Sequence, residues 1–287
     1  MTSEPTGPPD GPVTPRATCV RAPNPGPMTL DGTNTWVLAE PSGARAVVVD
    51  PGPNHEPHLR AVLAAVAAAG RTVAVCLLTH GHPDHAEGAR RFAELSGAPV
   101  RAYDEAHRVG NAGLADGDVI EVDGLDVRVV TTPGHTADSV CFLLPADRAV
   151  LTGDTVLGRG TTVVAHPEGR LVDYLASLRR LRALADSVPL DPAPLDTVLP
   201  GHGPVLTDAA AAVDGYLSHR AERLGQVAAA LAAGDRSADD VVRRVYADVD
   251  PAVWPAALLS VRAQLDYLAE QAAAVSGRAG PAVRRRG

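Results

Sequence analysis

Short apolar runs alternate with longer helical patterns over residues 17–207. Residues 73–78 form an unbroken apolar run, which is typical of a strand buried on both faces of a sheet. Residues 57–69 are rich in alanine and end at Gly70, and residues 84–95 and 173–185 also have helical spacing. This alternation predicts an α/β domain built from two halves, each with a sheet and flanking helices. The predicted strands are residues 35–39, 46–49, 73–78, 99–102, 119–122, 125–130, 139–144, 149–152 and 197–199.

From about residue 208 the strand pattern stops and helical patterns follow. Residues 209–233 predict one long helix that ends before Gly234. Ser237 and Asp240 have the spacing of a capping box for a second helix over residues 238–246. Asp250-Pro251 supplies the N-cap and first-turn residues of a third helix. We therefore expect an α/β domain at residues 17–207 and a small helical domain at residues 208–275.

The two ends of the chain have little apolar surface. Residues 1–16 contain five prolines, and residues 276–287 end in three arginines. Neither segment can bury enough surface to offset its ordering entropy, so residues 1–16 are predicted to be a disordered tail and residues 276–287 a basic tail.

Composition and charge exclude several functions. The formal net charge is −8, which argues against a general affinity for polyanions. All 26 basic residues are arginines, so no lysine is present for a P-loop or a Schiff base. Cys76 and Cys141 lie in apolar runs, and no CxxC pair is present, so we expect buried thiols rather than a metal or disulfide framework.

Neither a membrane segment nor a targeting segment is apparent. No apolar stretch reaches the ~18–20 residues of a membrane span, and residues 1–16 lack the features of a signal peptide. We therefore expect a cytoplasmic protein that does not contact a membrane. The sequence does not define its oligomeric state.

The strongest chemical pattern is Thr79-His80-Gly81-His82-Pro83-Asp84-His85, between a predicted strand and a predicted helix. Further ligand types follow later strands, each beside a glycine at which the backbone can turn sharply. These are His135, Asp154 and His202. Imidazole and carboxylate groups suit zinc, iron or manganese, and the first cluster could serve two adjacent ions. For an isolated His135 or His202 a polar turn residue would be the simpler interpretation, but one metal site explains all seven residues.

This arrangement resembles the metallo-β-lactamase superfamily, whose pattern is HxHxDH followed by separate His, Asp and His residues. The resemblance covers residues ~28–205 and implies an αββα sandwich with a dinuclear site at the sheet edge. In the family's pattern the first metal ion would be bound by His80, His82 and His135, the second by Asp84, His85 and His202, and Asp154 would bridge the two. His82 stands where the diiron redox branch typically has Glu, which favours a hydrolase with two zinc ions.

The expected chemistry follows from such a pair of ions. Two divalent cations can share a water molecule, lower its pKa and polarise the electrophile, so that the bridging hydroxide attacks a carbonyl carbon or a phosphorus atom. Asp84 would orient the hydroxide and thus act as the catalytic residue. Asp50, at the end of its predicted strand, is either a carboxylate that orients a ligand histidine or a turn-forming residue.

The substrate is less clearly defined. The segment Asn24–Thr35 resembles the opening of the lactamase-β-like subgroup, which includes a single-strand endoribonuclease and polyketide-releasing thioesterases and carries a winged-helix-like C-terminal domain. We expect a small acyl substrate such as a thioester, as in glyoxalase II, with single-stranded RNA as the alternative. Asn34 is a candidate substrate contact or a turn cap, and Tyr174 a candidate contact or a core residue. His55, His58 and His107 have polar sequence surroundings and are predicted to lie at the surface.

Overall fold

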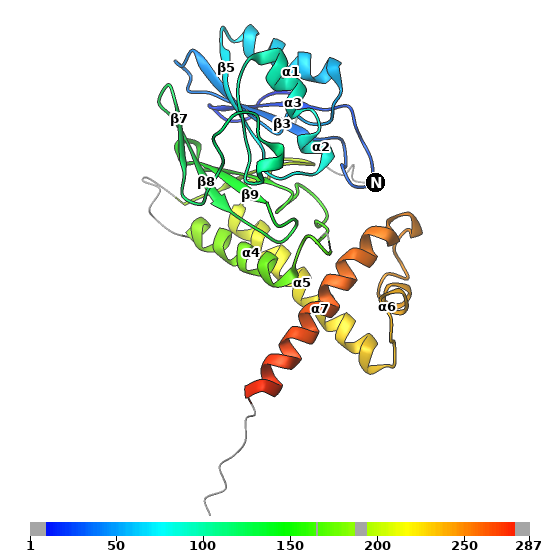
Figure 1. Cartoon of the computed structure of the whole chain (residues 1–287). Helices are drawn as coiled ribbons and strands as arrows, with labels where there is room; N and C mark the ends of the chain where they lie inside the picture. The colour runs from blue at the N-terminus through cyan, green and yellow to red at the C-terminus, as the bar shows by residue number, and fades with distance from the viewer. Residues whose placement is uncertain (1–9, 165, 187–193, 279–287) are drawn as a thin grey trace, which may run out of the picture.

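Two packed β-sheets with helices on their outer faces form the body of the protein (Figure 1). The computed structural model describes residues 10–164, 166–186 and 194–278. The first sheet has the order β1-β2-β3-β4-β5-β6 and the second the order β11-β10-β9-β8-β7. The strands are β1 Gly11–Pro12, β2 Ala17–Arg21, β3 Asn34–Leu38, β4 Arg45–Val49, β5 Thr72–Leu77, β6 Val100–Arg101, β7 Val119–Val122, β8 Leu125–Thr131, β9 Val140–Leu144, β10 Ala149–Gly153 and β11 Thr197–Pro200. The α-helices are α1 Glu56–Ala68, α2 Pro83–Ala86, α3 Ala89–Ser96, α4 Leu171–Asp186, α5 Ala209–Ala232, α6 Ala238–Val245 and α7 Trp254–Arg278.

Apolar side chains fill three layers of this body. Trp36 and Phe142 belong to the core between the two sheets. Phe92 of α3 belongs to the cluster that covers the outer face of the first sheet, and Leu178 of α4 to the cluster that covers the second. The burial of this apolar surface stabilises the αββα sandwich, and the fold class expected from the sequence is confirmed.

Strand direction explains why the polar loops meet at one edge. β4 and β5 are parallel neighbours in the first sheet. In the second sheet β9 is antiparallel to both β8 and β10, and β10 is parallel to β11. β8, β10 and β11 therefore run in the same direction, and the loops after them leave from the same edge of the sheet.

The helical appendage consists of the second half of α5 with α6 and α7 (Figure 1). Ser237 and Asp240 form the predicted capping box of α6, and Asp250 accepts a hydrogen bond from the backbone N–H of Ala252 at the next turn. The continuous helix α5 contributes to two cores, with Val213 packed against the sandwich and Val227 in the appendage. No strand occurs in the described residues 209–278. The domain boundary expected at residue 208 thus coincides with the start of a helix that both parts share.

Three local predictions differ from the structure. The predicted tail over residues 1–16 is too long, because β1 pairs with β2 and Arg16 forms ion pairs with Glu40 and Asp147. Residues 1–9 and 279–287 of the predicted tails lie outside the described residues, and α7 continues to Arg278. The single helix predicted over residues 84–95 is divided into α2 and α3 around Gly88, where the Gly88 N–H donates to the Gly52 carbonyl.

His58 is the third difference. It was expected at the surface, but it is 3% exposed, and a ring nitrogen lies 2.9 Å from Thr35 Oγ1. Its polar neighbours in sequence do not reveal that α1 turns this residue toward the first sheet. Among the described helices, none is both long and apolar enough to cross a membrane.

Candidate metal centre

The loop after β5 carries four of the seven predicted ligands. His80 lies between β5 and α2, and His82 has extended backbone, with φ −61° and ψ 144°, as the N-cap residue of α2. Pro83 occupies the first helical turn, where its fixed φ favours helix initiation, and Asp84 and His85 follow in that turn. The change from extended chain to helix directs these side chains to two adjacent places.

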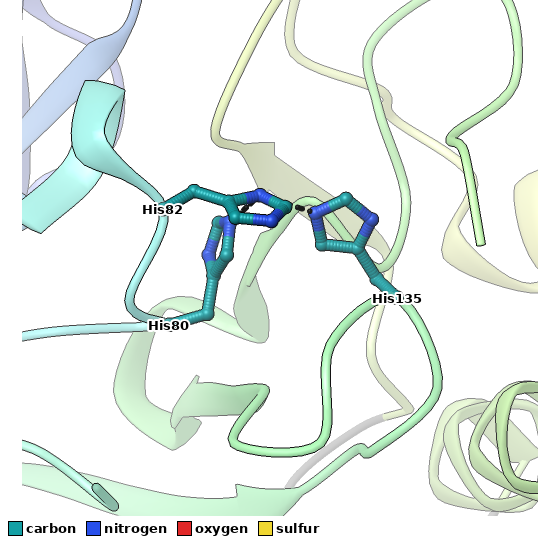
Figure 2. A group of neighbouring side chains, drawn as sticks. All are labelled: His80, His82 and His135. Carbon is teal, nitrogen blue, oxygen red and sulfur yellow. Dashed lines mark hydrogen bonds between the residues drawn. The ribbon is translucent and has the colours of Figure 1, made fainter. Parts of the chain in front are cut away.

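The first group of side chains is His80, His82 and His135 (Figure 2). His80 Nε2 and His135 Nε2 each lie 3.1 Å from His82 Nδ1. His135 comes from the loop after β8, so the group joins the edges of both sheets. Three imidazole nitrogens around one small space can hold a divalent cation.

The second group is Asp84, His85 and His202. His202 Nε2 lies 3.1 Å from His85 Nε2 and 3.1 Å from Asp84 Oδ2. His202 follows β11 and His85 belongs to α2, so this group also joins the two halves.

Asp154 lies between the two groups. Its Oδ1 is 3.4 Å from both His85 Nε2 and His202 Nε2, and its Oδ2 is 3.7 Å from His135 Nε2. Oδ1 is buried and has no hydrogen-bond partner among the described residues. A buried carboxylate oxygen without a donor fits coordination to a cation, because it would otherwise carry a desolvation cost.

Hydrogen bonds at the opposite ring nitrogens orient four of the histidines. His85 Nδ1 lies 2.8 Å from Asp50 Oδ2, and His135 Nδ1 lies 2.6 Å from the Val163 carbonyl oxygen. His202 Nδ1 lies 3.2 Å from the Gly32 carbonyl oxygen. His80 Nδ1 lies 3.0 Å from Thr79 Oγ1, whose own proton is donated to Asp50. These acceptors favour N–H on Nδ1 and leave the Nε2 lone pairs directed into the site.

The electrostatics of the two groups differ. Burial lowers the pKa of His80 and His135, which favours neutral rings. Burial also opposes charge on His85 and His202, but nearby carboxylates outweigh it, with Asp154 the largest contributor, and raise the pKa of His202 to about 9 and that of His85 well above its usual value. The pKa of Asp84 falls to about 2, because His85 and His202 outweigh its burial. The carboxylates of Asp84 and Asp154 thus place a negative potential at the second group, and this potential attracts a cation.

Glycines make room for this arrangement. A Cβ at Gly201 would lie 2.7 Å from Asp154 Oδ1 and 2.8 Å from His85 Cε1. A Cβ at Gly134, which has φ +139°, would lie 2.2 Å from the Cα of Tyr174. Side chains at either position would displace the ligands or the helix behind them.

The other predicted site residues, Asp50, Asn34 and Tyr174, are buried and form hydrogen bonds within the protein. Asp50 is 1% exposed and accepts hydrogen bonds from Thr79 N–H and Thr79 Oγ1 at 2.8 and 2.7 Å, as well as contacting His85. Asn34 is fully buried and donates to the carbonyls of Pro200 and Gly203, so it shapes the His202 loop. Tyr174 is fully buried and donates to the Thr155 carbonyl. The latter two side chains have no exposed surface for a substrate.

A cavity of about 320 Å³ opens beside the site. His135 and Asp154 form part of its wall. Further walls come from Pro27, Met28 and Leu30, from Leu157 and residues 159–163, and from α5 and the chain that follows it, including His219, Arg220 and Tyr246. Sequence patterns did not reveal this contribution, because it depends on how α5 and α7 pack against α4 and against each other.

Known proteins share both parts of the chain. Residues 28–202 match the family described as the metallo-beta-lactamase superfamily, and residues 237–278 match the beta-lactamase associated winged helix domain. A beta-lactamase-like protein 2 homolog of Caenorhabditis elegans is 34% identical over 255 residues, which cover 85% of this chain and 81% of the relative. An atrochrysone carboxyl ACP thioesterase of Aspergillus fumigatus is 36% identical over 224 residues, which cover 76% of this chain and 66% of the relative.

Solved structures show the same architecture. A beta-lactamase domain protein from Burkholderia ambifaria superimposes with a TM-score of 0.74 at 24% identity, covering 91% of this chain and 88% of that one. The fold therefore agrees over nearly the whole chain. Since the sequence pattern of one family covers more than half of the residues and a relative aligns along most of the length, the chain belongs to the metallo-beta-lactamase superfamily.

Proposed function

We propose that this metallo-β-lactamase-fold hydrolase holds two zinc ions and cleaves a thioester or a related acyl substrate. The observation that carries the proposal is the convergence of five imidazoles and two carboxylates, from four separate loops, on one small region. One zinc ion would be held by His80, His82 and His135 and the other by Asp84, His85 and His202, with Asp154 shared between them.

The donor chemistry fits this assignment. Nε2 atoms of neutral imidazoles and carboxylate oxygens are preferred zinc ligands. Asp154 Oδ1 lacks a donor, and the hydrogen bonds at the Nδ1 atoms fix the orientation of four rings before a cation arrives. Iron or manganese would accept the same ligand types, so metal analysis decides between them.

Two divalent cations, when bound, would lower the pKa of a shared water toward neutrality and polarise the substrate carbonyl. The Asp84 side chain is 27% exposed, the most open of the second group. Its low pKa keeps it ionised at neutral pH, so it can accept a hydrogen bond from the attacking water and orient the oxygen toward the acyl carbon. In the overall reaction a C–O bond forms, the C–S bond breaks, and the thiolate takes up a proton, leaving a carboxylic acid and a thiol.

The cysteines do not offer a competing nucleophile. All three are fully buried and free. Burial raises the pKa of the thiols of Cys19 to about 12 and of Cys141 to about 11, and it raises that of Cys76 as well. A thiol with a raised pKa is not ionised at neutral pH and is a poor nucleophile. This supports attack by water.

Two observations favour an acyl substrate. The cavity beside the site has many apolar side chains in its wall, among them Met28, Leu30, Leu157 and Val253, which suits an acyl chain. A fungal relative carries the name of an acyl-carrier thioesterase. Single-stranded RNA needs a basic groove with stacking aromatics, whereas the chain has a net charge of −8 and 3% aromatic residues.

Hydrolysis of a thioester panel and of labelled single-stranded RNA, with and without a chelator, tests the proposal. We expect thioester hydrolysis that the chelator abolishes, and a fall of roughly 10²–10⁴-fold in kcat for Asp84→Ala. Asp126→Ala, at an exposed position of β8, should retain activity. Mass spectrometry should find two zinc ions per chain. Chelator-sensitive cleavage of RNA without thioester hydrolysis would refute the acyl assignment.

A further inference from the structure

The cavity beside the metal centre has an unbalanced charge in its wall. Its charged side chains are Asp154 and three arginines, namely Arg159, Arg220 and Arg223. Arg159 forms an ion pair with Asp31 at 2.6 Å. Neither Arg220 nor Arg223 forms an ion pair with a carboxylate in the part of the chain that the structure describes.

Arg220 is the less expected of these two residues, because it is only 3% exposed. Its Nη2 donates to the Thr162 carbonyl, and its guanidinium lies 5.1 Å from the centroid of the Tyr174 ring. Its Nε is buried and has no hydrogen-bond partner among the described residues. A buried guanidinium without a counter-ion carries a desolvation cost, and a bound anion would offset that cost.

Arg223 and His219 extend the same surface of α5. They are four residues apart, and Arg223 is three residues from Arg220, so the side chains lie on one side of the helix. The Arg223 guanidinium lies 4.6 Å from the centroid of the Tyr246 ring and donates to the Val245 carbonyl, which holds it beside the cavity. His219 Nδ1 is buried and unpartnered in the described structure.

We propose that Arg220, Arg223 and His219 form a binding site for an anionic group, a carboxylate or a phosphate, at the part of the acyl substrate remote from the bond that is cleaved. The planar guanidinium presents paired N–H donors that match either anion. The inference rests on the proposed hydrolysis of an acyl substrate. The anion has two sources of the same chemistry, either a second carboxylate on the acyl chain or the phosphate of a phosphopantetheine-type thiol.

Equilibrium titration of the zinc-loaded protein with matched pairs of compounds tests the site and separates these sources. Decanoate and decanedioate each offer one carboxylate to the metal ions, so their difference in affinity reports the second carboxylate. Pantetheine and 4′-phosphopantetheine report the phosphate in the same way. We expect the wild-type protein to bind the anion-bearing member of one pair about 10- to 100-fold more tightly.

Arg223→Gln should remove that preference and leave the affinity for the matched partner unchanged, since its backbone and apolar neighbours remain. His219→Gln serves as a second variant in case Arg223→Gln unfolds. Arg243→Gln, which removes an exposed arginine paired with Asp240 on α6, is the matched control and should retain the preference.

The outcomes separate the two proposals. Equal affinities within both pairs in the wild-type protein, or a preference that survives in both variants, would overturn the anion site. Tighter binding of a short RNA oligonucleotide than of either small anion would also overturn its assignment to an acyl substrate. A confirmed preference without hydrolysis of any thioester would support the anion site and overturn the proposed reaction alone.

Discussion

Replacement of Asp50 by Asn tests how the metal centre is held. Asp50 Oδ2 accepts from Thr79 Oγ1 and contacts His85 Nδ1, while Oδ1 accepts from the Thr79 N–H. An amide can accept at one of these positions only. The orientation that keeps the oxygen toward His85 leaves the Thr79 N–H facing an NH₂ group.

The expected cost follows from this count. A buried donor without an acceptor costs about 1–3 kcal/mol, so the free energy of unfolding of the metal-free protein should fall by that amount. Loss of the negative charge also weakens the hydrogen bond between residue 50 and His85 Nδ1. Changes at residues that orient metal ligands typically reduce metal affinity about 10- to 100-fold. Urea denaturation with chelator and zinc competition against a chromophoric chelator measure the two effects.

Asp123→Asn is the matched control. Asp50 has φ +52° and Asp123 φ +51°, and Asn tolerates this left-handed conformation, so the backbone contribution is the same in both variants. Asp123 pairs with the exposed Arg45 at the surface, so we expect its replacement to change stability by about 1 kcal/mol or less and leave zinc affinity unaltered. Unchanged zinc affinity in Asp50→Asn would refute the assigned role of this carboxylate.

Three further predictions concern pH, space and thiols. The pKa of His58 is lowered to about 4 by burial, below its unfolded value of about 6.5, so stability should be lost as the pH falls through this window. Between pH 6.5 and 4 the free energy of unfolding of His58→Gln, measured in denaturation curves, should fall by up to about 3 kcal/mol less than that of the wild-type protein. Equal falls in the two proteins would contradict the burial argument. Gly201→Ala should lower zinc affinity, because its Cβ would meet Asp154 and His85. Gly225→Ala in α5 has open space and should raise the free energy of unfolding by about 0.5–1 kcal/mol without changing zinc affinity. Similar effects of the two substitutions would contradict this argument. Ellman's reagent should label the three buried thiols only after denaturant is added, and rapid labelling of the native protein would disagree with their burial.

The convergence of the seven candidate ligand side chains was predictable because these residues are marked locally in the sequence. Four ligands stand within six residues, and the others follow strand ends beside glycines, where parallel strands bring loops together. The partners that orient the rings were not predictable. The carbonyls of Gly32 and Val163 are backbone groups present in every residue type, so only the folded chain identifies them.

The fold showed a similar division between what local patterns revealed and what they did not. The capping box of α6 and the apolar strand β5 were recognised from neighbouring residues. β1 and β2 were not, since they are short, border a proline-rich segment and are stabilised by pairing with each other and with β3. The place of Arg220 in the cavity wall was not predicted, because only the packing of α5 in the folded chain brings this residue there.

The continuity of α5 limits how this protein can be recombined with its relatives. A chimera joined at residue 208 would take the first half of α5 from one parent and lay it against a sandwich from the other, so Val213 and Tyr216 would have to match foreign neighbours. A junction near Gly234, after the helix ends, would take all of α5 from the parent that supplies the sandwich. Only the contacts that α6 and α7 make with the rest of the protein would then join residues from different parents. Crossover points in engineered hybrids of this architecture should therefore be chosen at that glycine rather than where the strands stop.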